Sequence, residues 1–442
     1  MKRIILCLLL LVALVMVEPI AISANTAQKT DTDIELRVYA SGLYSNWEGV
    51  SNVSQFVDDE GNYCFAYNTD DSVIVVKTSE GKITKKINLK KQHKQFGAVE
   101  CDSDGYYYLV TGEENKTDDT SVNTVFVSKY SPAGKHIKTV GDVESGNGNS
   151  KVPFDAGNCD IAINGDYIAV NYARKMYSGH QSNTVLMLLK EDLSPADFGH
   201  SVYNSHSFGQ RAVPFDTGFV FASEGDCFNR AFTLDFVFSE SNSYSVPRSL
   251  DIFHFWVRKN TYNDWDMFTL NENFASLGDV CSLGGGRVSF VAASAKALNS
   301  DAASQNRQIF IQILDCKENK YITQGKRTGL SGPNGDTKVT DNGVKWLTKY
   351  TVKTGKTVNN VQAVADNDGN TIVLYELSKK GKYQGIYYCV VNRDGKVTTK
   401  ITRCTKDGRL NACETPVWAD GKVWWTANAV EGSNMFIYSL EP

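Results

Sequence analysis

Apolar and polar positions along the chain follow one recurring unit: an apolar stretch, a polar turn that ends in glycine, and a second stretch of aromatic and β-branched residues. The apolar stretches are short and no apolar period of 3.6 residues recurs, so the pattern predicts strands rather than helices. Glycine suits the turn because a tight hairpin needs a residue with positive φ. Seven glycines occupy this position: Gly61, Gly105, Gly165, Gly218, Gly286, Gly369 and Gly421.

A second hairpin follows the first in most copies. It is clearest at the polar turns Ser79–Lys82, Pro132–Lys135 and Arg393–Lys396. Each unit is therefore predicted to form two successive hairpins, or four antiparallel strands, and such units repeated around an axis are the blades of a β-propeller. In this respect the chain resembles the β-propeller superfamily over essentially its whole length after residue 24. The resemblance is one of architecture and singles out no family.

The two ends of the chain are expected to share one blade. After Gly421 only two strands remain, Val423–Ala427 and Met435–Leu440, while the alternation at Ile34–Ala40 predicts a strand that has no unit of its own. An N-terminal strand that completes the last blade would remove an exposed sheet edge. The sequence thus predicts an all-β, seven-bladed β-propeller of four-stranded antiparallel blades.

The uneven spacing of the turn glycines leaves two other architectures open. The interval from Gly286 to Gly369 also holds Val344–Tyr350, a further strand-like run that would make an eighth blade. A pair of β-sandwich domains is the other alternative, since it is also built of short strands and turns.

The first 24 residues have the pattern of a secretory signal peptide. Lys2 and Arg3 precede an unbroken apolar run, Ile4–Val17, and Ser23 and Ala24 are small residues that suit a cleavage site. We therefore expect cleavage near Ala24, a location outside the cell, and one propeller domain over residues 25–442 that is monomeric and has no membrane span. An uncleaved anchor is the alternative.

Composition narrows the classes of partner and cofactor. Lysine and arginine number 46 against 50 aspartates and glutamates, so the net charge favours neither nucleic acid nor an anionic membrane. The cysteines after Cys7 are scattered through apolar runs without a CxxC pair, which favours small buried side chains over disulfides or metal ligands. Asp58–Asn62 and Asp366–Asn370 resemble calcium loops only faintly and fall on the repeat turn. We predict no metal and no cofactor.

Candidate chemistry gathers in the third and fourth units. Loops that join the second strand of a blade to the third, or one blade to the next, are expected to meet on one face around the axis, where a rigid scaffold positions binding residues. A buried polar network between inner strands is one interpretation of polar residues there. A ligand site and a catalytic site are the others. The residues are Arg174, Tyr177, His180, Gln181, His206, Gln210, Arg211, Glu224, Asp226 and Arg230.

In a ligand site, arginine would bind carboxylates or sulfates in bidentate fashion and aromatic rings would stack on sugars. The predicted ligand contacts are Arg174, Gln181, Gln210, Glu224, Asp226 and Arg230.

In a catalytic site, His206 would act as the base, His180 or Tyr177 as the acid, and Arg211 would neutralise a substrate carboxylate, roles that suit β-elimination from uronic-acid polysaccharides. Glu224 and Asp226 would otherwise serve as the acid and base of a hydrolase. The sequence contains no HExxH, GxSxG, P-loop or dinucleotide-binding motif. The leading hypothesis is a secreted binding or scaffold protein that recognises a glycan or a protein on the cell surface, and an extracellular polysaccharide lyase or glycoside hydrolase is the alternative.

Overall fold

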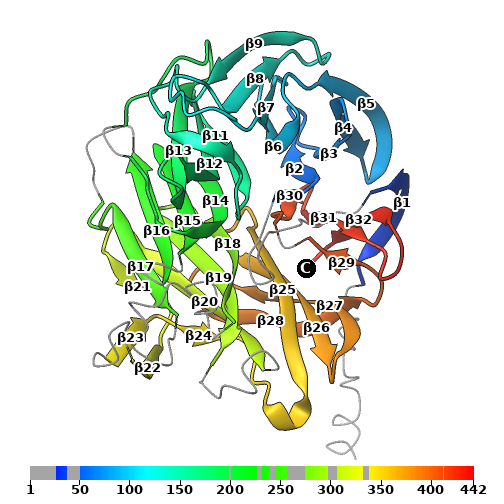
Figure 1. Ribbon diagram of the computed structural model, residues 1–442. Coiled ribbons are helices and arrows are strands. Elements are labelled where there is room, and N and C mark those ends of the chain that lie inside the picture. Colours follow the sequence, from blue (N-terminus) through cyan, green and yellow to red (C-terminus); the bar gives the residue numbers. More distant parts are fainter. Residues whose placement is uncertain are drawn as a thin grey trace, which may run out of the picture.

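The computed structural model of the protein describes residues 26–36, 50–198, 201–225, 231–238, 244–255, 274–296, 306–331, 338–411 and 413–442. Within these residues, seven sheets of four or five strands stand in a ring, with a further two-stranded sheet at the periphery (Figure 1). This is the predicted seven-bladed β-propeller. No helix in the described part of the chain has the length and apolar composition needed to cross a membrane.

The strands of blades 1, 2 and 4 follow chain order from the axis to the rim. Those of blade 1 are β2 (Val53–Val57), β3 (Tyr63–Asn68), β4 (Ser72–Ser79) and β5 (Lys82–Lys90). Those of blade 2 are β6 (Gln95–Cys101), β7 (Tyr107–Gly112), β8 (Val125–Tyr130) and β9 (His136–Gly141). Those of blade 4 are β14 (Ser207–Phe215), β15 (Gly218–Gly225), β16 (Ala231–Phe238) and β17 (Ser249–His254).

Blade 3 departs from this order. Its long strands are β11 (Cys159–Asn164), β12 (Tyr167–Met176) and β13 (Gln181–Leu189). Its fourth strand is the short β10 (Ser150–Pro153), which pairs with the end of β12 beyond β11 rather than at the rim.

The remaining blades carry insertions or share the chain ends. Blade 5 comprises β18 (Ser276–Ser282), β19 (Arg287–Ala295), β20 (Arg307–Asp315), β21 (Lys320–Tyr321) and β24 (Lys345–Trp346). A single-turn 3-10 helix (Val352–Thr354) leads into blade 6, which comprises β25 (Lys356–Ala365), β26 (Thr371–Lys379), β27 (Lys382–Val391) and β28 (Val397–Thr405). Blade 7 comprises β29 (Arg409–Leu410), β30 (Val417–Ala419), β31 (Lys422–Asn428), β32 (Asn434–Leu440) and β1 (Gln28–Glu35).

Central strands are apolar on both faces because each blade is packed between two others. β7 and β15 are buried at every position, whereas the rim strand β5 is mostly exposed. The hydrophobic core is accordingly divided into layers between blades. In the layer between blades 1 and 2, for example, Phe56 and Leu89 pack with Tyr107 and Leu109.

The turn glycines lie where they are predicted, in the hairpin between the two inner strands of each blade. Most of them have a positive φ, such as 83° at Gly61. Gly218 is different, because the positive φ of that turn belongs to Asp216. A Cβ atom at Gly218 would lie 1.9 Å from the carbonyl oxygen of Val237, so the close approach of β16 requires glycine there.

The chain ends share blade 7, as predicted. β1 is antiparallel to β32, with Gln28 opposite Ser439 and Ile34 opposite Met435. The strand begins earlier than the alternation at Ile34–Ala40 predicts, because a rim strand exposes most of its residues and does not need that pattern. Residues 37–40 lie outside the described residues, as does the predicted signal peptide, which stays a prediction.

The run Val344–Tyr350 does not begin an eighth blade. β24 pairs with β20 inside blade 5, after an inserted hairpin of β22 (Lys326–Ser331) and β23 (Lys338–Asn342). The ring also rules out two separate sandwiches.

An ion-pair cluster holds this hairpin against β17 of blade 4. Asp341 accepts hydrogen bonds from Nδ1 of His254 at 2.8 Å and from Nε of Arg327 at 2.8 Å. Burial alone would lower the pKa of His254, but its hydrogen bonds to Asp251 and Asp341 raise that pKa to about 9. The imidazole is therefore charged at neutral pH and joins two blades.

The cysteines in the described residues are free and buried, as their sequence positions favour. Burial raises the pKa of Cys64 and of Cys389 to about 12. Cys227 lies outside the described residues.

Candidate functional site

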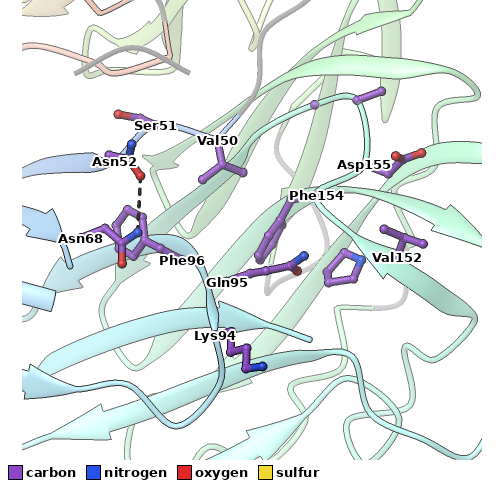
Figure 2. Close-up of a pocket in the computed structure, with 13 residues that line it drawn as sticks. Val50, Ser51, Asn52, Asn68, Lys94, Gln95, Phe96, Val152, Phe154 and Asp155 are labelled. Carbon is purple, nitrogen blue, oxygen red and sulfur yellow. Dashed lines mark hydrogen bonds between the residues drawn. The ribbon is translucent and has the colours of Figure 1, made fainter. Parts of the chain in front are cut away.

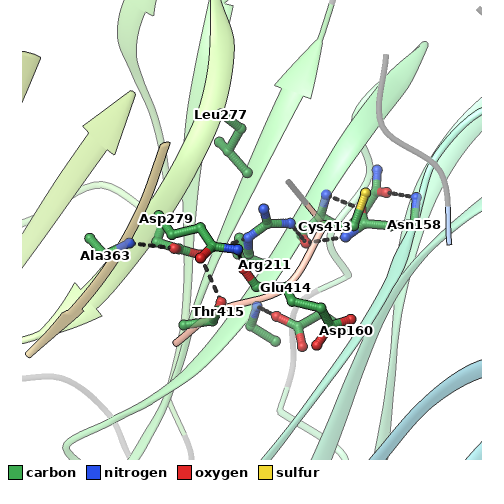
Figure 3. A network of polar contacts seen from close by, with 12 residues as sticks. Asn158, Asp160, Arg211, Leu277, Asp279, Ala363, Cys413, Glu414 and Thr415 are labelled. Atoms are coloured by element: carbon green, nitrogen blue, oxygen red, sulfur yellow. Dashed lines mark hydrogen bonds and ion pairs between the residues drawn. The ribbon is translucent and has the colours of Figure 1, made fainter. Parts of the chain in front are cut away.

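A belt of polar contacts joins the inner strands around the axis (Figure 3). In three places a side chain on one inner strand accepts a hydrogen bond from a backbone N–H group of the next blade. Backbone groups at an inner edge would otherwise lack a partner, so these contacts fix the spacing of neighbouring blades. The acceptors and donors are Ser54 and Val99 (3.2 Å), Asp160 and Ala212 (2.8 Å), and Asp279 and Ala363 (2.6 Å).

Arg211 belongs to this belt. Its Nε donates to Asp279 at 2.8 Å, and its Nη1 donates to the backbone oxygen of Gln210 at 2.9 Å. The hydroxyl of Thr415, from blade 7, donates to the same Asp279 oxygen at 2.7 Å. Both members of the ion pair are almost fully buried. Arg211 was predicted to bind a substrate carboxylate, but its side chain is already paired with Asp279.

Three further buried carboxyl groups belong to this region: Asp160 and Glu414 interact with Arg211, and Glu100 interacts with Asp160. Burial raises the pKa of Glu100 to about 8 and the pKa of Asp160 to about 6, the latter in spite of the charge of Arg211. Burial also raises the pKa of Glu414, which lies beside Asp160 in Figure 3, well above its usual value. With a pKa of about 8, Glu100 holds a proton at neutral pH.

A pocket of about 370 Å³ opens among the loops of blades 1, 2 and 3 (Figure 2). The pocket lies on the face where the loops between blades, and those between second and third strands, were expected to meet. Its residues come from the segment before β2, the end of β3, the start of β6 and the segment between β10 and β11. Its lining combines amide, cationic, carboxylate and aromatic side chains. The principal ones are Asn52, Asn68, Lys94, Gln95, Phe96, Phe154 and Asp155.

Lys91 ties two walls of this pocket together. Its ammonium group donates to Oδ1 of Asn68 at 2.9 Å, to the backbone oxygen of Thr69 at 2.7 Å and to the backbone oxygen of Lys94 at 3.0 Å. Burial lowers the pKa of Lys91. The three contacts set the distance between the loop after β3 and the loop before β6.

The third wall is a loop with unusual backbone geometry. Phe154 has a φ of 60° and Ala156 a φ of 56°, both in the left-handed region that glycine favours. Each such residue costs about 1 kcal/mol relative to ordinary geometry, and strain of this kind is concentrated at functional sites. Asp155 lies between them, and burial raises its pKa. The backbone N–H group of Phe154 donates to Ala173 at 2.7 Å, which holds the loop on β12.

The predicted histidines adjoin this wall. The rings of His180 and His206 have centroids 4.7 Å apart, and Nε2 of His180 lies 2.8 Å from the hydroxyl of Ser205. Burial and the neighbouring His206 lower the pKa of His180. The amide of Gln181 donates to the backbone oxygens of Asp155 at 3.2 Å and of Ser207 at 2.5 Å. The structure thus brings His180, Gln181 and His206 together beside the pocket.

Other predicted residues contact different partners. The hydroxyl of Tyr177 accepts from Asn115 at 2.6 Å and donates to the backbone oxygen of Asp119 at 3.0 Å. Nη1 of Arg174 donates to the backbone oxygen of Gly148 at 3.0 Å. Tyr177 therefore joins blade 3 to the β7–β8 loop of blade 2, and Arg174 contacts the connection that leads from blade 2 into β10.

The remaining predicted residues lie between blades or outside the described residues. Gln210 and Asn158 bond reciprocally, and the Gln210 backbone N–H group donates to the Asn158 side chain at 2.5 Å. Glu224 accepts from the backbone N–H group of Leu277 at 3.2 Å. Asp226 and Arg230 are outside the described residues. The functional roles assigned to all of these residues stay predictions.

Sequence reasoning missed the pocket itself. Asn52, Asn68, Gln95 and Asp155 are single polar residues on separate loops, and none has the chemistry of a histidine or arginine cluster. The sequence did offer one signal for the pocket, which is the position of these residues in loops between strands. Loops of this kind were expected to meet on one face around the axis, and the same expectation led to the candidates in blades 3 and 4.

No protein-family model matches this chain, and no curated protein matches it. Similar solved structures include the AfRom2 CNH domain, with 10% identity over 93% of this chain and 98% of that chain and a TM-score of 0.38. The Dos1 propeller has 11% identity over 91% of this chain and 95% of that chain, with a TM-score of 0.39. A chain of the mitotic checkpoint complex has 9% identity over 95% of this chain and 94% of its own, with a TM-score of 0.46. The likeness concerns the fold alone.

Proposed function

We propose that this protein is a secreted binding protein whose pocket on blades 1–3 holds a glycan. The observation that carries the proposal is the lining of the pocket. Sugars present hydroxyl groups to amides and charged groups, and they present apolar ring faces to aromatic side chains. Amide, charged and aromatic groups converge here from Asn52, Asn68, Lys94, Gln95, Phe96, Phe154 and Asp155.

The walls of the pocket support binding because they are fixed before any ligand arrives. Lys91 joins two of them, and the strained loop of Phe154 and Ala156 is hydrogen-bonded to blade 3. A rigid site loses less conformational entropy when it binds. The signal-peptide pattern of residues 1–24 supports a location outside the cell.

We do not propose the lyase or hydrolase alternative. Of its two acid candidates, Tyr177 is bonded to Asn115 and Asp119, while His180 lies beside the base candidate His206. Its carboxylate-binding candidate Arg211 is paired with Asp279 at the axis. Tyr177 shares the β12–β13 turn with His180, but the side chains of Tyr177 and Arg211 are both bonded to other partners, so the lyase arrangement has no free carboxylate binder beside the histidine pair.

The test is a glycan array screened with the chain from residue 25, followed by calorimetry with the retained oligosaccharides. Replacing Gln95 and Asp155 together by alanine removes two polar groups from the lining. We expect a loss of affinity of about tenfold or more, since each lost hydrogen bond contributes about 1 kcal/mol. The matched control is Gln384→Ala with Asp166→Ala, outside the pocket. Retention of no glycan, or equal affinity of the pocket variant and the control, would refute the proposal.

A further inference from the structure

The rim strand of blade 1 carries an unusual set of charges. In β5, the ammonium-bearing residues Lys82, Lys85, Lys86 and Lys90 are all exposed, and the strand contains no acidic residue. At about 3.3 Å per residue, the nine residues of β5 extend over about 30 Å. The strand is the outer edge of its sheet and lies at the rim of the ring (Figure 1).

No ion pair in the described part of the chain involves any of these lysines. Lys85 lies opposite Lys77 in the β4–β5 ladder. Lys77 is itself satisfied by Asp58 at 2.9 Å and Asp59 at 3.1 Å, so it offers Lys85 no anion. The carboxylates of Asp70 and Asp71, in the turn before β4, act on Lys91.

Protection of a sheet edge does not require so many lysines. Charged side chains of either sign, prolines, bulges and short strands all protect an edge, so protection does not call for a strand whose charges are all positive. The rim strand of blade 7 carries charges of both signs, because β1 contains Lys29 as well as Asp31, Asp33 and Glu35. The uniform charge of β5, in a chain with a net charge of −4, therefore fits a partner with the opposite charge.

The strand leads directly to the pocket. The chain passes from Lys90 through Lys91, which is anchored at the loop after β3, to Lys94 and Gln95 in the pocket wall. Lys94 is exposed and lines the pocket, so the segment that runs from the rim strand to the pocket also carries a positive charge. A long ligand with repeated negative charges would follow this path.

We propose that the protein binds an anionic polysaccharide, one segment of which lies along β5 while a neighbouring sugar occupies the pocket. This inference rests on the proposed function and specifies its ligand class. The exposed lysines supply charge attraction along the polymer, and the pocket supplies contacts to an individual sugar. The acidic groups are carboxylates, sulfates or phosphates, which share the chemistry that an ammonium group recognises.

The experiment measures fluorescence anisotropy of labelled polymers with the chain from residue 25. The probes are polygalacturonate, dextran sulfate and a phosphorylated dextran, with neutral dextran as the uncharged probe and polyglutamate as a polyanion without sugars. The rim variant is Lys85→Gln, Lys86→Gln and Lys90→Gln. The control variant removes three exposed positive charges from blade 6: Lys379→Gln, Lys382→Gln and Lys400→Gln.

We expect at least one anionic polysaccharide to bind more tightly than neutral dextran and polyglutamate. The rim variant should weaken that binding about tenfold and flatten its dependence on salt, because exposed charge pairs are screened near 0.15 M ionic strength. The control variant should leave both unchanged. Equal losses in the two triple variants, unchanged binding in the rim variant, or equal binding of polyglutamate would overturn the inference.

The two proposals fail separately. If short neutral oligosaccharides bind in a way that depends on Gln95 and Asp155 but not on the β5 lysines, the proposed sugar pocket stands and the inferred anionic polysaccharide is refuted. Polymer binding that needs the lysines but is unaffected by the pocket substitutions would remove the pocket and the sugar-specific part of this inference.

Discussion

Substitution of Asp279 by alanine tests whether the axial belt holds the propeller together. The carboxylate of Asp279 accepts from Nε of Arg211, from the hydroxyl of Thr415 and from the backbone N–H group of Ala363. The four groups come from blades 5, 4, 7 and 6. Asp279→Ala therefore removes a connection that no single blade can replace.

The magnitude follows from the burial of the ion pair. Arg211 is 2% exposed and Asp279 is fully buried. Removing one partner of a buried, hydrogen-bonded ion pair costs about 3–5 kcal/mol, because the other charge loses its compensation in a medium of low polarity. The double variant Arg211→Met with Asp279→Leu removes both charges and keeps the volume, so it should be destabilised less than Asp279→Ala.

Urea unfolding followed by tryptophan fluorescence gives the required comparison. We expect the midpoint of Asp279→Ala to fall with little change in the slope of the transition. Asp366→Ala is a suitable control, since this carboxylate serves a turn between β25 and β26. If Asp279→Ala unfolds at the same urea concentration as this control, or if the double variant is the less stable of the two, the belt does not have the role inferred from its geometry.

Three other predictions concern pH, the inserted hairpin and the thiols. Burial raises the pKa of Glu100 from 4.5 to about 8, so the folded state holds an extra proton in this interval and stability should fall as pH rises through it; Glu100→Gln should flatten the decline in a series of urea midpoints. Asp341→Ala should increase hydrogen exchange in β22 and β23 while that of β26 is unchanged, because Asp341 of β23 bonds to Arg327 of β22 and holds the hairpin to His254 of β17. The buried thiols in the described residues should resist iodoacetamide until urea is added, since their raised pKa values leave almost no thiolate; rapid labelling of Cys64 or Cys389 in the native protein would contradict this.

The sequence was sufficient for the ring because the repeat is local. Each turn glycine marks a hairpin whose strands are neighbours in the chain, and the count of units predicts the count of blades. The N-terminal strand was the harder case. The apolar alternation after Ile34 identified the right region, but β1 is a rim strand and its polar residues gave no signal of their own.

The candidate site was less accessible to sequence reasoning, and the reason is geometric. An inner strand turns its polar side chains toward the adjacent blades. Arg211 and Gln210 therefore bond to neighbouring strands, although their chemistry would also suit a ligand. The pocket instead collects one or two residues from each of several loops, and such residues become neighbours only when the ring closes.

The pairing of β1 with β32 also sets an order on the folding of the chain. Hydroxyl Oγ1 of Thr32 bonds to the backbone oxygen of Met435, 403 positions away in the chain. Because a chain is synthesised from its amino end, β1 is made long before its partner strand β32. Until β32 has been made, β1 has no strand of blade 7 to pair with. Blade 7 therefore combines strands from both ends of the described chain, and the ring of blades can close only after β32 has been made.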